Sequence, residues 1–133
     1  MGHPVIDRWH EVIKSGDIKA LEALLDDEAV FHSPVVFTPQ RGRRITTLYL
    51  AAAFQVLGGS SFKYLREVIG ETDAVLEFQT EIDGITINGI DMIQWNDAGK
   101  ITDFKVMVRP LQAINKVHEK MGEMLEKYQK AAS

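Results

Sequence analysis

The sequence predicts an α+β domain in which helices pack against an antiparallel sheet. First, the helical and strand patterns do not alternate, as they would in a doubly wound sheet. Two helical segments, a strand and a third helical segment come first, followed by four consecutive strand segments and a last helical segment. Second, two turn signals, Asp83-Gly84 and Asn96–Gly99, join the last three strands into an antiparallel meander. We expect residues 1–133 to form a single domain.

Composition indicates a soluble, folded chain and excludes several kinds of site. Apolar residues make up 45% and charged residues 26%, which are ordinary values for a globular protein. The absence of cysteine excludes disulfides, thiolate metal sites and cysteine nucleophiles, and is consistent with a cytoplasmic protein. A net charge of −4 argues against nucleic-acid binding as the main function. No apolar stretch approaches a membrane span, so no membrane partner is expected.

Two helices are expected at the start of the chain. Apolar residues at helical spacing predict one from Pro4 to Lys14 and another from Ile18 to about Leu25. Gly16 is expected to end the first helix in a left-handed conformation, and Asp17 to cap the second. The segment Asp26-Asp27-Glu28 is expected to end the second helix.

A short strand and a third helix follow. The strand is predicted over Ala29–Ser33, and the segment Val35–Arg43 is predicted as a loop because prolines bracket it. A helix with small residues at its middle is predicted from about Thr46, and Gly58-Gly59 is expected to end it.

The clearest local signal is the alternation of apolar and polar residues in the second half of the chain. A strand is predicted over Phe62–Ile69, and the meander over Ala74–Ile82, Ile85–Trp95 and Ile101–Val108. A long last helix is then predicted from Pro110 to about Tyr128, with apolar residues near heptad spacing.

Four short motifs support a more specific fold. They are Ser15-Gly16-Asp17, the segment Leu24–Phe31, Ser33-Pro34-Val35 with the Gly42 loop, and the segment Ile90–Ile101. In this order and spacing the chain resembles the nuclear transport factor 2-like superfamily (SnoaL-like and ketosteroid-isomerase-like domains) from about Val5 to Pro110. The resemblance implies a cystatin-like cone: a curved antiparallel sheet with helices packed on its concave face around an apolar pocket, with the long C-terminal helix as an addition. This superfamily includes isomerases, dehydratases, epoxide hydrolases, polyketide cyclases and non-catalytic binding modules, so the fold alone does not select a function.

The ketosteroid isomerases give the most informative comparison within that resemblance. They use a first-helix tyrosine and a strand aspartic acid as oxyanion donors, and a first-strand aspartate as the base. Asp91 matches the strand aspartic acid, whereas Trp9 stands at the tyrosine position and Ser33 at the base position. Standard ketosteroid isomerisation is therefore not expected. The Arg-Asp pair of the limonene epoxide hydrolases corresponds to Lys105-Val106, which argues against that chemistry as well.

Asp91 is the candidate catalytic residue. Strand alternation places it on an apolar face with Ile87, Gly89, Ile93 and Trp95. Burial there should raise the pKa of the carboxyl, and the neutral acid would then donate a hydrogen bond, as the resemblance to the ketosteroid isomerases implies. The alternative is a structural carboxyl at a wet pocket edge. Trp9, which has only an N–H donor, either donates to a ligand or to Asp91, or simply fills the core.

The expected ligand pocket is aromatic and needs neither a metal nor a cofactor, since the histidines show no metal-ligand spacing with acidic residues. Its expected lining is Trp9, Phe31, Ser33, Phe37, Phe54, Phe78, Trp95, Phe104 and Val106. Two functions remain open. One is a pocket protein that binds a small apolar carbonyl-type ligand and transforms it without a cofactor, by isomerase, cyclase or dehydratase chemistry. The other is a non-catalytic dimeric module for ligand binding or protein interaction.

The opposite face of the sheet is expected to form a homodimer. The outward residues there are Ile90, Met92, Lys105 and Met107. This mixture is more apolar than a solvated sheet face would normally be. The last helix either extends this interface or covers the pocket mouth.

Overall fold

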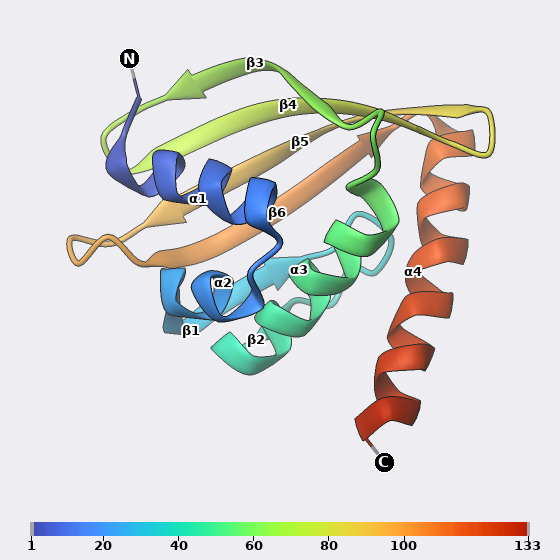
Figure 1. Ribbon diagram of the computed structural model, residues 1–133. Helices are drawn as coiled ribbons and strands as arrows, with labels where there is room; N and C mark the ends of the chain where they lie inside the picture. Colours follow the sequence, from blue (N-terminus) through green and yellow to red (C-terminus); the bar gives the residue numbers. More distant parts are fainter. Residues whose placement is uncertain (1, 133) are drawn as a thin grey trace.

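A computed structural model describes residues 2–132 of the chain, with side chains described as far as Tyr128. The helices are α1 (Pro4–Ser15), α2 (Ile18–Leu24), α3 (Arg43–Leu57) and α4 (Leu111–Ala132). The strands are β1 (Leu25–His32), β2 (Gln40–Arg41), β3 (Lys63–Ile69), β4 (Asp73–Ile82), β5 (Ile85–Trp95) and β6 (Ile101–Arg109). The curved sheet has α1, α2 and α3 on its concave side, and α4 stands at one end of it (Figure 1). The predicted α+β class and the cystatin-like architecture are confirmed.

The strand order in the six-stranded sheet is β2-β1-β6-β5-β4-β3. The predicted meander is present as antiparallel pairs, in which Leu76 of β4 lies opposite Asp91 of β5, and Asp91 lies opposite Val106 of β6. The sheet is not wholly antiparallel, however, because β1 pairs with β6 in parallel, with Phe31 opposite Phe104. These two strands are separated by about half of the chain, so no local pattern reveals their relative direction.

Two predicted helix caps and one predicted hairpin turn are confirmed. Gly16 takes the left-handed conformation (φ 68°) that ends α1. The side chain of Asp17 accepts hydrogen bonds from two backbone N–H groups in the first turn of α2. Asp83 and Gly84 both have positive φ, 51° and 80°, as a tight hairpin turn between β4 and β5 requires.

The start of β1 differs from the prediction. The strand begins at Leu25 rather than at Ala29 and ends at His32, so Asp26-Asp27-Glu28 lies inside the strand instead of separating it from the helix. Leu25 is buried and pairs with Ile101 of β6, which fixes the strand at this end. The register shifts after Leu25, and this irregularity leaves Asp27 in solvent, although a regular strand would have turned it inward with Leu25 and Ala29.

Other element bounds differ by small amounts. The two-residue strand β2, Gln40–Arg41, was not predicted, because two residues are too few to show the alternation of apolar and polar residues that indicates a strand. The helix α3 begins at Arg43 rather than at Thr46, and α4 runs past Tyr128 to Ala132. No helix among the described residues is both long enough and apolar enough to cross a membrane.

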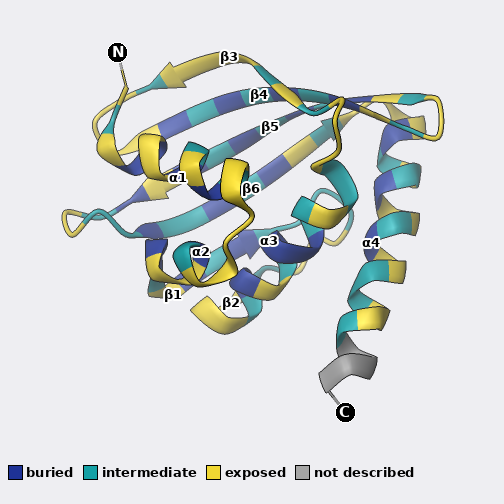
Figure 2. Ribbon diagram, viewed as in Figure 1, coloured by how far each residue is buried: buried dark blue, intermediate teal, exposed yellow. Residues whose placement is uncertain are grey.

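The core lies between the concave face of the sheet and the helices. Figure 2 shows the buried residues in alternation along the central strands. Gly89 of β5 is part of this packing, because a Cβ atom there would lie 2.5 Å from the ring of Phe78 and 2.5 Å from the carbonyl oxygen of Met107. The absence of a side chain at Gly89 therefore leaves room for the Phe78 ring against β5.

Candidate functional site

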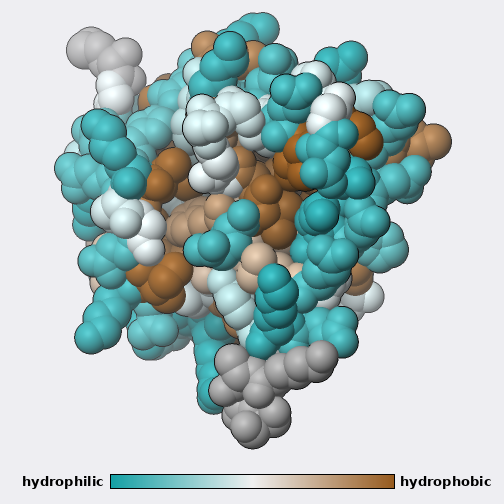
Figure 3. All heavy atoms as spheres, turned by 45° about the vertical axis from the view of Figure 1, so that its right-hand side comes forward, coloured by the Kyte–Doolittle hydropathy of each residue, from teal (hydrophilic) through white to brown (hydrophobic). Residues whose placement is uncertain are grey.

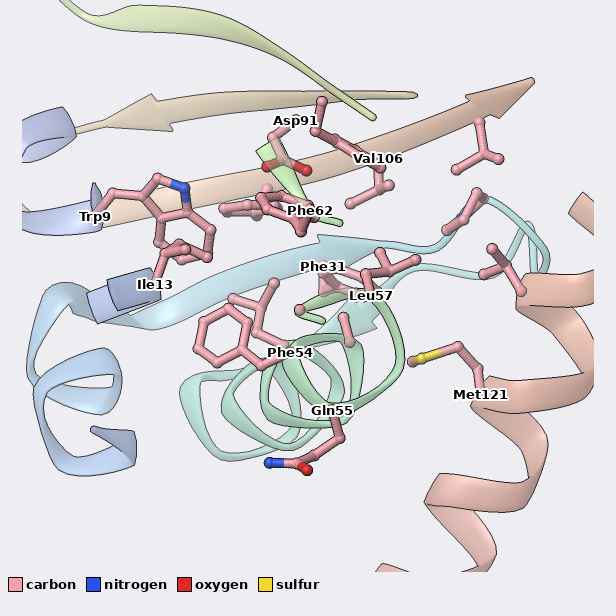
Figure 4. Close-up of a pocket in the computed structure, with 18 of the residues that line it drawn as sticks. Trp9, Ile13, Phe31, Phe54, Gln55, Leu57, Phe62, Asp91, Val106 and Met121 are labelled. Atoms are coloured by element: carbon pink, nitrogen blue, oxygen red, sulfur yellow. The ribbon is translucent and has the colours of Figure 1, made fainter. Parts of the chain in front are cut away.

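An apolar cavity of about 300 Å³ lies between the concave face of the sheet and helices α1, α3 and α4 (Figure 4). This volume is at the lower end of the range for small-molecule sites. Its inner lining is mainly aromatic and aliphatic: Trp9, Ile13, Phe31, Leu50, Ala53, Phe54, Leu57, Phe62, Phe78, Phe104, Val106, Val108, Val117 and Met121. The polar groups in its interior are therefore few, as they are in sites that use one or two polar contacts to orient an apolar ligand.

The cavity opens between the C-terminal ends of α1 and α3. The exposed lining residues are Lys14, Ser15 and Gly16 at the end of α1, and Gln55 and Gly58 at the end of α3. Apolar side chains gather in a hollow on the face seen in Figure 3, with hydrophilic side chains around them. A ligand that enters here passes a polar rim before it reaches the apolar interior.

Asp91 is the acidic residue of the lining, and it is only 7% exposed. It lies on β5 between Leu76 of β4 and Val106 of β6, so apolar side chains flank it on both sides. Burial raises the pKa of its carboxyl from 3.8 to about 7, because the ionised form loses its hydration; a hydrogen bond from Tyr64 offsets part of this rise. Near neutral pH the neutral and ionised forms of Asp91 are therefore both populated.

A chain of two hydrogen bonds ends on Asp91. The Tyr64 hydroxyl donates to Asp91 Oδ2 over 2.7 Å, and the Trp9 indole Nε1 donates to the Tyr64 hydroxyl oxygen over 2.9 Å. In Figure 4 the indole nitrogen of Trp9 lies on the same side of the cavity as the Asp91 carboxyl. Burial and the nearby Asp91 raise the pKa of Tyr64 well above its ordinary value, so Tyr64 remains a hydrogen-bond donor at neutral pH.

A protein-family model described as the SnoaL-like domain matches residues 6–104. The chain belongs to the SnoaL-like domain family. This match agrees with the predicted membership of the nuclear transport factor 2-like superfamily. An ntf2-like protein of unknown function from Mesorhizobium loti shares the fold, with a TM-score of 0.69 and 19% sequence identity. The match covers 80% of this chain and 88% of that one.

Two solved structures are similar in sequence as well as in fold. A steroid delta-isomerase from Pseudomonas aeruginosa is 34% identical, with a TM-score of 0.89 and coverage of 95% of this chain and 92% of that one. A protein with a cystatin-like fold from Silicibacter pomeroyi is 32% identical, with a TM-score of 0.84 and coverage of 91% and 84%. No curated protein matches the chain.

Most of the predicted pocket residues of this SnoaL-like chain lie together around the cavity. Asp91 and the predicted lining residues Trp9, Phe31, Ser33, Phe54, Phe78, Phe104 and Val106 all contribute to it. Trp9 reaches Asp91 only through Tyr64, so direct donation to Asp91, one of the alternatives given for Trp9, is not observed. Whether these residues bind a ligand stays a prediction.

Phe37 and Trp95 lie away from the cavity. Phe37 is fully exposed, because the loop that carries it runs over the surface between two prolines. Trp95 is buried at the far end of β5, where its indole N–H donates to the Glu71 carbonyl over 3.0 Å and its ring packs against His3. Alternation placed Trp95 on the correct face of the strand, but position along the strand decides whether a side chain reaches the cavity.

Ser33 lines the cavity without a basic partner. Its hydroxyl oxygen accepts a hydrogen bond from the backbone N–H of Val35 over 3.1 Å. The neighbouring His32 instead contacts Asp103, with Nε2 2.8 Å from Oδ1. Ser33 is therefore not part of a Ser–His pair.

Sequence reasoning missed Tyr64, and it left open whether the last helix covers the pocket mouth or extends the dimer interface. Tyr64 lies on β3, most of which is exposed, and the register of β3 against β4 shifts directly after it. The one available signal was the spacing of Phe62 and Tyr64, two aromatic residues that share a strand face. Val117 and Met121 of α4 enter the cavity from a helix that lies outside the family pattern. Among residues 2–132, no group of three or more acidic or histidine side chains is arranged to hold a metal ion.

Proposed function

We propose that this SnoaL-like chain binds a small, apolar, uncharged carbonyl compound in the cavity, with neutral Asp91 donating a hydrogen bond to the carbonyl oxygen. One observation carries this proposal: a carboxyl with a pKa of about 7 faces an otherwise apolar cavity. Only its Oδ2 atom has a hydrogen-bond partner among the described residues, namely Tyr64. The other oxygen is available to a ligand.

The same geometry supports proton-transfer chemistry at the ligand. When a carbon next to a carbonyl loses a proton, negative charge develops on the carbonyl oxygen, and a hydrogen bond from a neutral carboxyl stabilises that charge. Isomerisation, cyclisation and dehydration of carbonyl compounds all use such a step and need no cofactor. The similarity to a protein described as a steroid delta-isomerase supports a ligand of this kind.

The identity of the proton acceptor distinguishes the two candidate functions. Apart from Asp91, the described lining of the cavity contains no acidic residue and no histidine, and Ser33 is not activated by a base. In the catalytic candidate, water or a basic group of the substrate accepts the proton. In the second candidate, the cavity binds the ligand without turnover, and the lack of a base in the lining favours this function.

The test uses a steroid ketone with a β,γ double bond as the probe. Calorimetric titration measures its affinity, and absorbance of the conjugated ketone product measures its isomerisation. We expect the probe to bind at pH 6 and Asp91→Asn to weaken binding by about tenfold, because a hydrogen bond to a carboxylic acid is exchanged for a weaker amide donor. The exposed turn variant Asp97→Asn is the matched control and should bind like the wild type.

Three results are distinguishable in that experiment. Binding with product formation that disappears in Asp91→Asn supports the catalytic function. Binding without product supports the binding module. An affinity that Asp91→Asn leaves unchanged, or no binding of this probe or of smaller cyclic ketones, contradicts the proposal.

We also propose a homodimer through the outer sheet face. On that face Ile90 lies opposite Met107, and Met92 lies opposite Lys105, so the four residues form a continuous patch across β5 and β6. Met107 is 48% exposed in the single chain. Sedimentation velocity at micromolar concentration should give a dimer, and Met107→Glu should give a monomer; a monomeric wild type contradicts this proposal.

A further inference from the structure

The Tyr64 hydroxyl lies between two groups of opposite hydrogen-bonding character. On one side the Trp9 indole nitrogen is 2.9 Å away, and on the other side Asp91 Oδ2 is 2.7 Å away. An indole N–H is a donor only, whereas a phenol has a single proton to donate. The Tyr64 proton therefore has no acceptor at Trp9, and the acceptor that it does have is Asp91.

We infer that Trp9 is a positioning residue, which fixes the Tyr64 proton toward Asp91 Oδ2 and thereby directs the acidic proton of neutral Asp91 to Oδ1, the oxygen that Tyr64 leaves free. The direction of the two hydrogen bonds carries this inference. In a neutral carboxyl the carbonyl oxygen is a better acceptor than the protonated oxygen, so the 2.7 Å hydrogen bond from Tyr64 to Oδ2 favours the acidic proton on Oδ1. Because Oδ1 has no hydrogen-bond donor among the described residues, it is the free site for the proton.

This arrangement gives the cavity a donor of fixed position. A carboxylic acid whose proton points to a protein neighbour presents only an acceptor to a ligand, and such a site would not hydrogen-bond a carbonyl oxygen. With the proton on Oδ1, the site presents an O–H group to the ligand. The consequence for ligand binding rests on the proposed function, whereas the direction of the hydrogen bonds does not.

Trp9→Phe removes the indole N–H and retains an aromatic ring. Trp9 packs with Phe104 and Phe54, at centroid distances of 4.8 and 5.7 Å, and a phenyl ring preserves part of that packing. Without the indole, the Tyr64 hydroxyl is free to turn and accept a hydrogen bond from a protonated Asp91 Oδ2. This new hydrogen bond stabilises the neutral acid relative to the carboxylate, so the pKa of Asp91 should rise further.

The chain offers a matched control in its second tryptophan. Trp95 is also buried, and its indole N–H donates to the backbone carbonyl of Glu71 over 3.0 Å, away from the cavity. Trp95→Phe makes the same chemical change at the same kind of buried site. It should leave the titration of Asp91 unchanged.

The experiment is a carbon-13 NMR titration of ligand-free protein labelled at the aspartate carboxyl carbon, with the Asp91 signal assigned by its loss in Asp91→Asn. We expect the midpoint for Asp91 to move upward by about 0.5 to 1 pH unit in Trp9→Phe, the equivalent of one ordinary hydrogen bond. A merely structural role of Trp9 gives the opposite sign, because a loosened core admits water and lowers the midpoint. A midpoint that is unchanged or lowered in Trp9→Phe overturns the inference.

A second measurement does not depend on the folding of Trp9→Phe. In Tyr64→Phe, the proton resonance of the Trp9 indole N–H should move upfield, because this group loses its acceptor, while that of Trp95 should stay in place. An unchanged Trp9 resonance contradicts the inference. Both measurements use ligand-free protein, so they do not depend on ligand binding. If both give the expected result but no carbonyl compound binds, the proposed function is refuted and the inference about Trp9 stands.

Discussion

Asp91→Asn should have a higher free energy of unfolding than the wild type above pH 7, and this difference should shrink as the pH falls. Burial raises the pKa of Asp91 from 3.8 to about 7, a difference of about 3 units. At about 1.4 kcal/mol per unit, ionised Asp91 lowers the free energy of unfolding by on the order of 4 kcal/mol. Asparagine has nearly the same volume, cannot ionise, and retains an oxygen that accepts the hydrogen bond from Tyr64.

The sign of the pH dependence follows from proton binding. Between pH 4 and 7 the folded protein binds more protons at Asp91 than the unfolded chain, since its folded pKa is about 7. The free energy of unfolding of the wild type should therefore fall as the pH rises through this window, and level off above it. For Asp91→Asn this contribution is absent.

Urea unfolding followed by tryptophan fluorescence at pH 5, 6, 7 and 8.5 measures the effect. The difference in free energy of unfolding, Asp91→Asn minus wild type, should increase by about 2 to 3 kcal/mol between pH 5 and 8.5. Asp97→Asn, in the exposed turn between β5 and β6, should show no such increase, because water solvates that side chain in both states. A difference that stays constant with pH would refute the assignment of Asp91 as a buried acid with a raised pKa.

Three further substitutions test other parts of the account. Tyr64→Phe should raise the pKa of Asp91, because the hydrogen bond from Tyr64 lowers it; a carbon-13 titration measures this, and a lowered pKa would contradict it. Gly89→Ala should lower the free energy of unfolding by about 1 to 3 kcal/mol, since the added Cβ atom would lie 2.5 Å from the Phe78 ring. A urea midpoint equal to that of the wild type would show that the strand accommodates the added methyl group. Phe37→Ala should change the free energy of unfolding by less than about 0.5 kcal/mol, because this side chain is fully exposed; a larger loss in urea would mean that it is covered in solution.

The parts of the fold that the sequence revealed are those encoded by neighbouring residues. The alternation in β4 and β5 and the Asp83-Gly84 turn between them are local, and their register follows once the turn is known. The parallel pairing of β1 with β6 is not local, and the acidic segment Asp26-Asp27-Glu28 conceals the start of β1 because a register shift interrupts the alternation there. A regular period is needed before a pattern indicates a strand.

The candidate site shows the same division. Asp91 was found through its match to the strand aspartic acid of the ketosteroid isomerases, and the regular alternation of its strand placed it on a face with apolar neighbours. Tyr64, its direct partner, was missed because β3 is mostly exposed and its pairing with β4 is irregular. Trp9 marked the position of a lost tyrosine in the resemblance, yet a hydroxyl group reaches Asp91 from another strand. Only the folded arrangement shows that a hydroxyl group on β3 donates a hydrogen bond to Asp91.

The most direct test of the central claim is the affinity of a neutral cyclic ketone for the wild-type protein, measured by calorimetry from pH 5 to 9. If neutral Asp91 donates to the carbonyl oxygen, the affinity should be highest at low pH and should fall as the pH rises through the pKa of about 7, whereas in Asp91→Asn it should not vary with pH. An affinity of the wild type that is independent of pH, or that rises as Asp91 ionises, would contradict the claim.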